Sequence, residues 1–252
     1  MVIWLYCIFS NEAQMLPHFL RHYAPQVDRL ILFDNCSADN SLAIISGYSN
    51  AIVLPYPADR PVMDSVSAAQ FASMQYHEAH GKADLVLWVD CDEFLYSSGT
   101  PLCEALRDIH ARSIRAVRSV GYQMLSNDFP TGAAPLTEQV RFGIRDTEYD
   151  KVAVFDPALN IRFRPGRHNC RIDGATAEQT GIKLLHYRYL GVEYFMRRNA
   201  YLDANRSAAE RQAGRSYHVA SNHQGKYSLG WYQQVQAYAT DVIEHNLVEV
   251  TA

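Results

Sequence analysis

Nearly unbroken apolar runs alternate with helix-like stretches through the first hundred residues. Four runs have the pattern of strands covered on both faces, and they occupy residues 2–9, 29–33, 51–54 and 85–89. The stretches between them carry apolar positions at helical spacing behind polar capping residues, and they occupy residues 11–23, 38–47 and 64–80. This alternation predicts an α/β fold with an open, mostly parallel central sheet flanked by helices. Ligands of such sheets bind at the carboxyl ends of the strands.

The chain beyond residue 100 is less regular. Helical patterns occupy residues 101–113, 192–212 and 231–245, and short strand patterns occupy residues 114–120, 151–155, 160–163 and 183–190. Two segments rich in glycine, proline and polar residues, 127–139 and 166–181, are predicted as loops. Because neither a linker nor a repeat interrupts the sequence, we expect a single domain over residues 1–252, divided into halves 1–100 and 101–252.

Charge and composition exclude several classes of protein. The chain is 48% hydrophobic and 20% charged with a net charge of −4, which argues against a generally basic nucleic-acid binder and against long disorder. No stretch approaches the roughly 18–20 apolar residues of a membrane span, and the run 2–9 lacks the flanks of a signal peptide. The five cysteines are odd in number, widely spaced and without a CxxC pair, so we expect reduced thiols and a cytoplasmic protein.

The most informative segment is Trp88-Val89-Asp90-Cys91-Asp92-Glu93-Phe94, in which two carboxylates follow a buried strand. In extended backbone, residues two apart point to the same side, so Asp90 and Asp92 are expected to face one site. Close carboxylates repel each other unless a cation lies beside them. Mg²⁺ and Mn²⁺ prefer oxygen ligands and often add substrate phosphates to their shell. The segment therefore predicts a metal site that binds a diphosphate, and the alternative is a pair of solvated acids at a strand end.

A second acid stands at the end of the strand predicted at 29–33. Asp34 opens the segment Asp-Asn-Cys-Ser-Ala-Asp-Asn-Ser. A carboxylate at such a strand end can accept hydrogen bonds from a ribose hydroxyl or a base N–H. Ser37 and Asp39 are expected to cap the next helix, which leaves Asp34 for a ligand.

In their order and spacing these segments resemble the nucleotide-diphospho-sugar transferases of the GT-A fold. The resemblance is closest to the glycosyltransferase family 2-like branch and the neighbouring DUF23-type, family 92-like group, and it spans roughly residues 1–200. The matching segments are Ser10-Asn11-Glu12, the segment from Asp34, the segment from Trp88, Pro165-Gly166-Arg167-His168 and His186-Tyr187-Arg188-Tyr189.

The resemblance implies that the half 1–100 binds a nucleotide sugar and that the half 101–252 forms the acceptor side. Six positions match the family's nucleotide and metal sites: Asn11 and Glu12 beside the nucleotide, Asp34 at the base or ribose, Asp90 at the ribose and metal, and Asp92 and His186 at the metal. A buried core residue is the alternative for His186. Asn35 departs from the acid usual in family 2, and the motifs of processive polysaccharide synthases are missing from the sequence.

The general base of such a transfer has no motif of its own. Asp128, in the polar loop after residue 126, is our first candidate, and Glu148 and Asp150 are its rivals. The candidates for contact with the diphosphate or with an anionic acceptor are basic side chains of the second half, for which a solvated edge is the alternative: Lys151, Arg162, Arg164, Arg167 and Arg171. The resemblance matches His168 to a less well-defined active-site histidine. The polar stretch with His218 and His223 is a candidate lid over the donor, and a solvated loop is the alternative.

We therefore expect a metal-dependent glycosyltransferase, inverting if it follows the family. It would use Mn²⁺ or Mg²⁺ to move a hexose from a UDP- or GDP-sugar to a carbohydrate or glycolipid acceptor in cell-surface polysaccharide or glycolipid synthesis. Two other functions stay open. One is a nucleotidyltransferase acting on a sugar phosphate, and the other is a non-catalytic carbohydrate-binding protein on a degenerate transferase fold.

Overall fold

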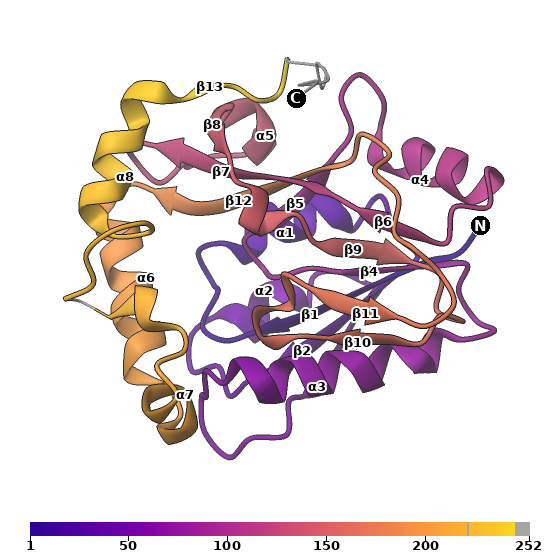
Figure 1. Cartoon of the computed structure of the whole chain (residues 1–252), viewed down its shortest axis with the longest axis horizontal. Coiled ribbons are helices and arrows are strands. Elements are labelled where there is room, and N and C mark those ends of the chain that lie inside the picture. The colour runs from indigo at the N-terminus through magenta and orange to yellow at the C-terminus, as the bar shows by residue number, and fades with distance from the viewer. Residues whose placement is uncertain (221, 245–252) are drawn as a thin grey trace.

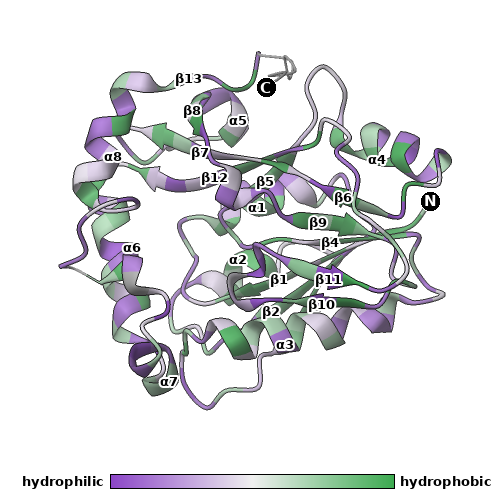
Figure 2. Ribbon diagram, viewed as in Figure 1, coloured by the Kyte–Doolittle hydropathy of each residue, from purple (hydrophilic) through white to green (hydrophobic). Residues whose placement is uncertain are grey.

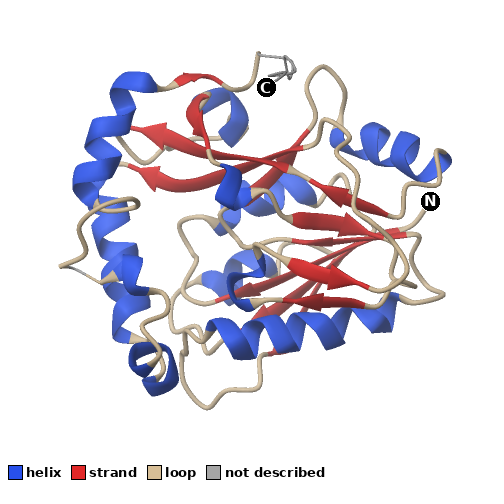
Figure 3. Cartoon of the chain, in the orientation of Figure 1, coloured by secondary structure: helices blue, strands red, loops and turns tan. Residues whose placement is uncertain are grey.

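Two β-sheets and the helices around them make up the fold (Figures 1 and 3). The computed structural model describes residues 1–220 and 222–244. In Figure 1, α3 (Ser65–Gln75) runs beneath the first sheet, while α6 (Val192–Ala204) and α8 (Leu229–Val235) stand across one end of the strands. The predicted α/β class, with a mostly parallel central sheet and flanking helices, is confirmed.

The first sheet has six strands in the order β3-β2-β1-β4-β9-β6. They are β1 (Ile3–Phe9), β2 (Arg29–Asp34), β3 (Ala51–Pro55), β4 (Leu85–Trp88), β9 (Val152–Phe155) and β6 (Ala116–Arg118). The first four are parallel, and β9 and β6 are antiparallel to their neighbours. Because β1 lies between β2 and β4, the acids predicted after β2 and β4 leave the same edge of the sheet on either side of β1.

The unbroken apolar character of β1 follows from its two buried faces. Leu5 and Cys7 point into one hydrophobic core, and Trp4 and Tyr6 point into another. On the second face, the ring of Tyr6 stacks between Phe33 of β2 and Trp88 of β4, with centroid separations of 6.3 and 5.1 Å. Figure 2 shows the hydrophobic colour concentrated on these strands. Burial on both faces thus fixes β1 at the centre of the sheet.

The N-terminal helices are shorter than the sequence predicts. They are α1 (Leu16–Tyr23), α2 (Ser41–Ile45), α3 and α4 (Leu102–Ala111). The predicted start of the first helix at residue 11 is wrong, because Asn11 has a φ of +51° and the carbonyl of Glu12 accepts the first N–H bonds from Met15 and Leu16. The predicted cap of α3 is confirmed: the Asp64 carboxylate accepts from the Ser67 N–H at 2.9 Å.

A second sheet, which the sequence pattern does not predict as such, has five strands in the order β13-β8-β7-β12-β5. They are β5 (Glu93–Tyr96), β7 (Val120–Ser126), β8 (Phe142–Arg145), β12 (Lys183–Leu190) and β13 (Thr240–Asp241). β12 pairs antiparallel with β5 and parallel with β7. The chain passes from β4 of the first sheet to β5 of the second through the segment that carries Asp90 and Asp92.

The rest of the chain forms short elements. A two-stranded ribbon pairs β10 (Ile161–Phe163) with β11 (Cys170–Ile172), and the remaining helices are α5 (Leu136–Gln139) and α7 (Ala208–Gln212). The short 3₁₀ turns are η1 (Tyr76–Ala79), η2 (Thr147–Tyr149), η3 (Pro165–Arg167), η4 (Tyr217–Val219) and η5 (Gln236–Tyr238). The helix predicted over 231–245 is wrong beyond α8, since η5 and β13 follow it; His245 lies outside the described residues.

Two further expectations concern the whole chain. All five cysteines are free, as predicted, and Cys7 and Cys91 are buried. Within residues 1–220 and 222–244, no helix has the length and apolar character needed to cross a membrane.

We predict that Gly121→Ala destabilises the protein and disturbs the residues around η2. A Cβ at Gly121 of β7 would lie 2.5 Å from the backbone carbon of Tyr149, an approach that only rearrangement relieves. The expected loss in the free energy of unfolding is about 1–3 kcal/mol, measured by urea denaturation. Gly47→Ala is the matched control, because the nearest atom to its added Cβ is 3.6 Å away. Equal stability of the two variants would contradict this packing argument.

Candidate active site

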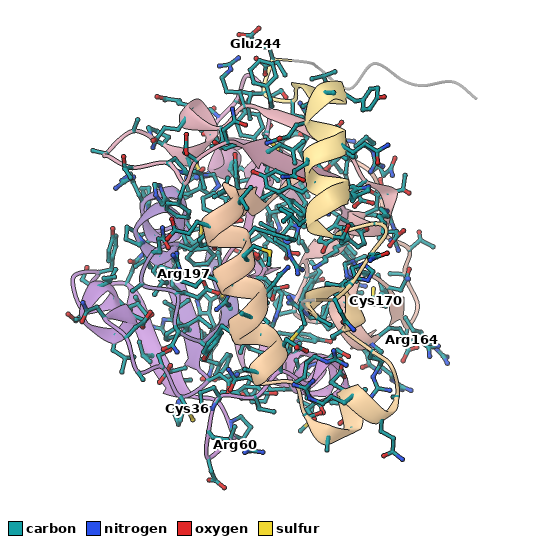
Figure 4. All side chains as sticks on the ribbon, turned by 90° about the vertical axis from the view of Figure 1, so that its left-hand side faces the viewer. Cys36, Arg60, Arg164, Cys170, Arg197 and Glu244 are labelled. Atoms are coloured by element: carbon teal, nitrogen blue, oxygen red, sulfur yellow. The ribbon has the colours of Figure 1, made fainter. Side chains whose placement is uncertain are left out.

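A cleft of about 280 Å³ opens where the carboxyl ends of β1 and β4 face α6. Residues that follow three parallel strands line it, represented by Ser10, Asn35 and the turn from Asp90 to Glu93. Arg198 and Leu202 of α6 line the opposite wall. Figure 4 looks onto this end of the molecule and shows α6 and α8 in front of the sheets. The position of the cleft matches the strand ends at which open α/β sheets bind ligands.

The turn between β4 and β5 is closed by a reciprocal pair of hydrogen bonds. The Glu93 N–H donates to the Asp90 carbonyl at 3.0 Å, and the Asp90 N–H donates to Oε2 of Glu93 at 3.0 Å. The other carboxylate oxygen of Glu93 accepts from the ammonium of Lys151. Both side chains are almost completely buried. The Glu93–Lys151 ion pair therefore sets the path of the segment that presents Asp90 and Asp92.

Asp90 lies among cations. Its carboxylate accepts from the guanidinium of Arg167 and lies 3.6 Å from Nζ of Lys151. Enclosure by protein would raise the pKa of Asp90, but Arg167 and then Lys151 outweigh this effect and lower it. Arg167 comes from η3, where it adopts a φ of +57°, and its guanidinium also lies 5.9 Å from the ring centre of Trp88. The charge of Asp90 is thus balanced by side chains of this protein.

Asp92 pairs instead with His186 of β12. Oδ2 of Asp92 lies 3.3 Å from Nε2 of His186. Burial would raise the pKa of Asp92, but His186, followed by the more distant Arg198, holds it well below its ordinary value. The two residues meet because β12 pairs with β5 in the register that sets His186 opposite Glu93.

The orientation of His186 is fixed from behind. Gln123 of β7 donates from its amide nitrogen to Asp146 at 2.9 Å, so its carbonyl oxygen faces Nδ1 of His186 at 2.7 Å. An amide oxygen only accepts, which requires a hydrogen on Nδ1 and makes Nε2 the ring nitrogen that faces Asp92. Nε2 is therefore the atom at which a metal ion can replace a proton. Tyr149 stacks on the imidazole with a centroid separation of 4.4 Å. This is the arrangement in which an outer group orients a histidine ligand.

The pair of Asp92 and His186 fits a divalent ion that keeps open positions. It supplies one carboxylate oxygen and one oriented imidazole nitrogen, both donors that Mn²⁺ accepts. No cluster of three or more His, Cys, Asp or Glu side chains placed to hold a metal occurs among residues 1–220 and 222–244. Asp90 differs from Asp92 and His186, because it already forms ion pairs with Arg167 and Lys151. The protein thus offers two ligands, and an ion there needs water or phosphate oxygens to complete its shell.

Glu12 and Arg198 form a second ion pair at the cleft. Arg198 also donates to the Ser10 carbonyl at 3.0 Å. Burial raises the pKa of Glu12 to about 7, although Arg198 opposes the shift. The pair joins the loop after β1 to α6, and both residues line the cleft.

Asn11 and Asp34 have local partners in this structure. The side-chain oxygen of Asn11 accepts from the N–H of Ala38 at 2.7 Å, and Asp34 accepts from the Ser37 N–H at 2.9 Å. Neither residue is among those that line the cleft, whereas Asn35, the departure from the family pattern, lines it. Asn11 and Asp34 therefore shape the loops beside the cleft.

The structure does not bring Asp128 to the cleft. Asp128 borders a separate hollow of about 140 Å³ together with Gly191 and Arg197. Its rivals also lie elsewhere: Asp150 accepts from the Gly121 N–H and pairs with Arg145, and Glu148 is exposed and pairs with Lys226. Asp128 is thus not supported as the general base of this cleft. None of the residues 127–139 lines the cleft, and this segment, predicted as a loop, ends in α5.

The basic candidates separate in the same way. Lys151, Arg167, His168 and His218 line the cleft. Burial lowers the pKa of both His168 and His218 to about 3, so these rings are neutral at pH 7. The remaining candidates, Arg162, Arg164, Arg171 and His223, are not among the lining residues; Figure 4 shows Arg164 at the margin of the molecule.

Three residues in or behind the cleft have no motif of their own in the sequence. Gln123 lies behind the cleft, and Tyr149 and Arg198 line it. Each acts through a partner far along the chain: His186 for Gln123 and Tyr149, and Glu12 for Arg198. Spacing between motifs does not identify them, because the tertiary fold brings these partners together.

We predict that Lys151→Met lowers the free energy of unfolding by about 3–5 kcal/mol, since it leaves the buried Glu93 carboxylate without its cation. Lys151→Met combined with Glu93→Leu is expected to be more stable than Lys151→Met alone, because the unpaired charge is gone. Urea denaturation measures both. Lys82→Met removes a lysine from an exposed pair with Glu78 and serves as the control, with an expected loss below about 1 kcal/mol. If Lys151→Met also lost less than about 1 kcal/mol, the Glu93–Lys151 pair would not have the structural role given to it here.

No protein-family model matches this chain, and no curated protein matches it either. Among solved structures, it is similar to glucosyl-3-phosphoglycerate synthase from Mycobacterium tuberculosis in complex with Mn²⁺, UDP-glucose and phosphoglyceric acid. The identity is 21% and the TM-score 0.33, over 48% of this chain and 44% of the other. The same synthase with Mg²⁺ and UDP gives 21% and 0.32. A structure described as a mycobacterial protein gives 18% and 0.33, over 41% of its length. The chain thus matches less than half the length of each.

Proposed function

We propose that this protein is a metal-dependent glycosyltransferase of the GT-A type that uses a nucleoside-diphosphate sugar. One observation carries the proposal: at the carboxyl edge of a mostly parallel sheet, Asp92 faces His186, whose tautomer Gln123 fixes. Such a pair suits a divalent ion that takes the rest of its shell from a diphosphate. The likeness to the mycobacterial synthases is too distant to add weight, so the proposal rests on the geometry of the cleft and on the motif resemblance.

In this proposal Asp92 and His186 hold Mn²⁺ or Mg²⁺. When bound, the ion would neutralise the charge that develops on the leaving diphosphate. The chain's own part is to hold these two ligands in place, through Gln123 behind the imidazole and through the Glu93–Lys151 pair beneath the turn. Arg167 and Lys151 keep Asp90 ionised beside them, so that Asp90 is able to accept hydrogen bonds from a ribose.

The nucleoside is proposed to occupy the wall formed by the ends of β1, β2 and β3. This wall presents Ser10, Asn35 and the ring of Tyr56, followed by Val62 and Met63. Apolar surface with a few polar groups is the usual lining of a small-molecule site. UDP and GDP are both candidates for the donor nucleotide, and the acceptor is proposed to be the hydroxyl of a carbohydrate or glycolipid reached from the cytoplasm.

The experiment is a calorimetric titration of UDP and of GDP, each with and without MnCl₂. We expect one nucleotide to bind at least about tenfold more tightly with Mn²⁺, and Asp92→Ala and His186→Ala to abolish this gain. Asp108→Ala, which removes an exposed acid of α4 paired with Arg112, is the control and is expected to keep it. Release of UDP or GDP from the matching nucleotide sugar then tests transfer or hydrolysis.

Two results would count against the proposal. One is nucleotide binding that MnCl₂ does not change while Asp92→Ala binds as the wild type does. The other is pyrophosphate release from a nucleoside triphosphate and a sugar 1-phosphate, which a nucleotidyltransferase produces and a glycosyltransferase does not.

A further inference from the structure

The cations of the cleft have different kinds of partner. Arg167 pairs with Asp90, Lys151 with Glu93, and Arg198 with Glu12. Arg188 differs from them: among the described residues, no carboxylate forms an ion pair with it. Arg188 is therefore the cation of the cleft whose charge this part of the protein leaves without a direct counter-charge.

Arg188 is also buried and poorly hydrogen-bonded. Only 7% of the residue is exposed. Among the described residues, its side chain makes a single hydrogen bond, from Nη2 to the side-chain oxygen of Asn199 in α6 at 2.5 Å, and its guanidinium lies 5.8 Å from the ring centre of Phe195. Its Nε is buried and has no hydrogen-bond partner in this described part of the chain. A guanidinium has five N–H donors, so most of its donor capacity is unused.

This arrangement is unfavourable unless something else is bound. A guanidinium keeps its charge at every pH that proteins experience, so it cannot escape burial by losing a proton. A buried charge without a partner destabilises the folded state, and a buried polar atom without a hydrogen bond calls for a ligand or another explanation. The fork of donors on a guanidinium matches the oxygens of a phosphate or a carboxylate.

Arg188 lies close to the proposed metal ligands. It follows His186 by two residues on β12 and lines the same cleft. Its charge reaches Asp92, whose pKa it helps to lower after the larger effects of burial, His186 and Arg198. An anion on Arg188 would thus lie close to the proposed metal ligands, on the wall contributed by the second half of the chain.

We propose that Arg188 binds an oxyanion of the acceptor, so that this transferase acts on an acceptor that carries a phosphate or a carboxylate near the reacting hydroxyl. The inference rests on the proposed function. In the proposed function a divalent ion neutralises the diphosphate of the donor, which leaves the charge of Arg188 for a second anion. Because the donor's diphosphate also carries oxyanions, the experiment has one arm for the donor and one for the acceptor.

The first arm measures the donor site. UDP and GDP are titrated calorimetrically in the presence of MnCl₂ against the wild type, Arg188→Gln and the control Arg115→Gln. Arg115 forms an exposed pair with Asp156 and does not line the cleft. We expect the nucleotide affinity of Arg188→Gln to stay within about threefold of the wild type. A loss of tenfold or more would place the guanidinium on the donor's diphosphate and overturn the acceptor assignment.

The second arm measures the acceptor site with inorganic phosphate as the probe. Phosphate is titrated into the protein saturated with Mn²⁺ and the nucleotide that binds, and separately into the free protein. We expect phosphate to bind the wild type and Arg115→Gln, and to bind Arg188→Gln on the order of tenfold more weakly or not at all. Arg188→Lys keeps the charge but not the fork, and an intermediate affinity is expected. Phosphate binding that is absent from the wild type, or equal in Arg188→Gln, would overturn the proposal.

Thermal unfolding separates a binding role from a structural one. Because no carboxylate of the described residues forms an ion pair with Arg188, Arg188→Gln without ligands is expected to melt at or above the temperature of the wild type. A clear fall in the melting temperature would mean that Arg188 stabilises the fold, and would overturn the proposal. If neither nucleotide binds the wild type, the proposed function fails. Phosphate binding to the free protein that depends on Arg188 would then still establish the anion site.

Discussion

A buried carboxylate at the junction of the two sheets is the constraint on which the rest of the cleft depends. Glu93 begins β5, and its two oxygens take different partners, the ammonium of Lys151 and the Asp90 N–H. Neither oxygen can be left unpaired at this depth without a large loss of stability. The turn that leads from one sheet to the other is therefore held in one conformation. This conformation places Asp90 and Asp92 at the cleft.

A chain of hydrogen bonds continues from the turn to the outer surface. Asp92 contacts His186, His186 contacts Gln123, and Gln123 donates to Asp146. Asp146 in turn accepts from Lys226 at 2.9 Å and from the hydroxyl of Tyr227 at 2.9 Å. Asp146 only accepts hydrogen bonds, so the amide nitrogen of Gln123 faces Asp146 and its oxygen faces Nδ1 of His186. The network that begins near the surface therefore sets the orientation of the imidazole.

The sequence predicts those parts of the structure that local pattern determines. β1, β2 and β4 are recognisable because both of their faces are buried, and the acids after them follow from the topology of a parallel sheet. In the second sheet, β12 coincides with the strand predicted at 183–190. Its neighbours β7 and β8 are not recognisable, since they contain Gly121 and Gly143, where a side chain would collide with the backbone of Tyr149 and of Gln123. Glycine weakens a strand pattern, although here the close packing of the strands requires it.

The candidate site also contains residues that the sequence predicts and residues that only the tertiary structure identifies. The sequence predicts Asp90 and Asp92 from their spacing and His186 from the family resemblance, and all three line one cleft. The partners that give them their chemistry could not be found in that way. Lys151 lies 58 residues from Glu93, and Gln123 lies 63 residues from His186. The contacts from Glu12 to Arg198 and from Ser10 to Tyr201 span 186 and 191 residues. During synthesis, Glu12 can therefore meet its counter-charge only after α6 has left the ribosome. The wall of the cleft that Arg198 supplies thus becomes available long after the strands that present Asp90 and Asp92 have been made.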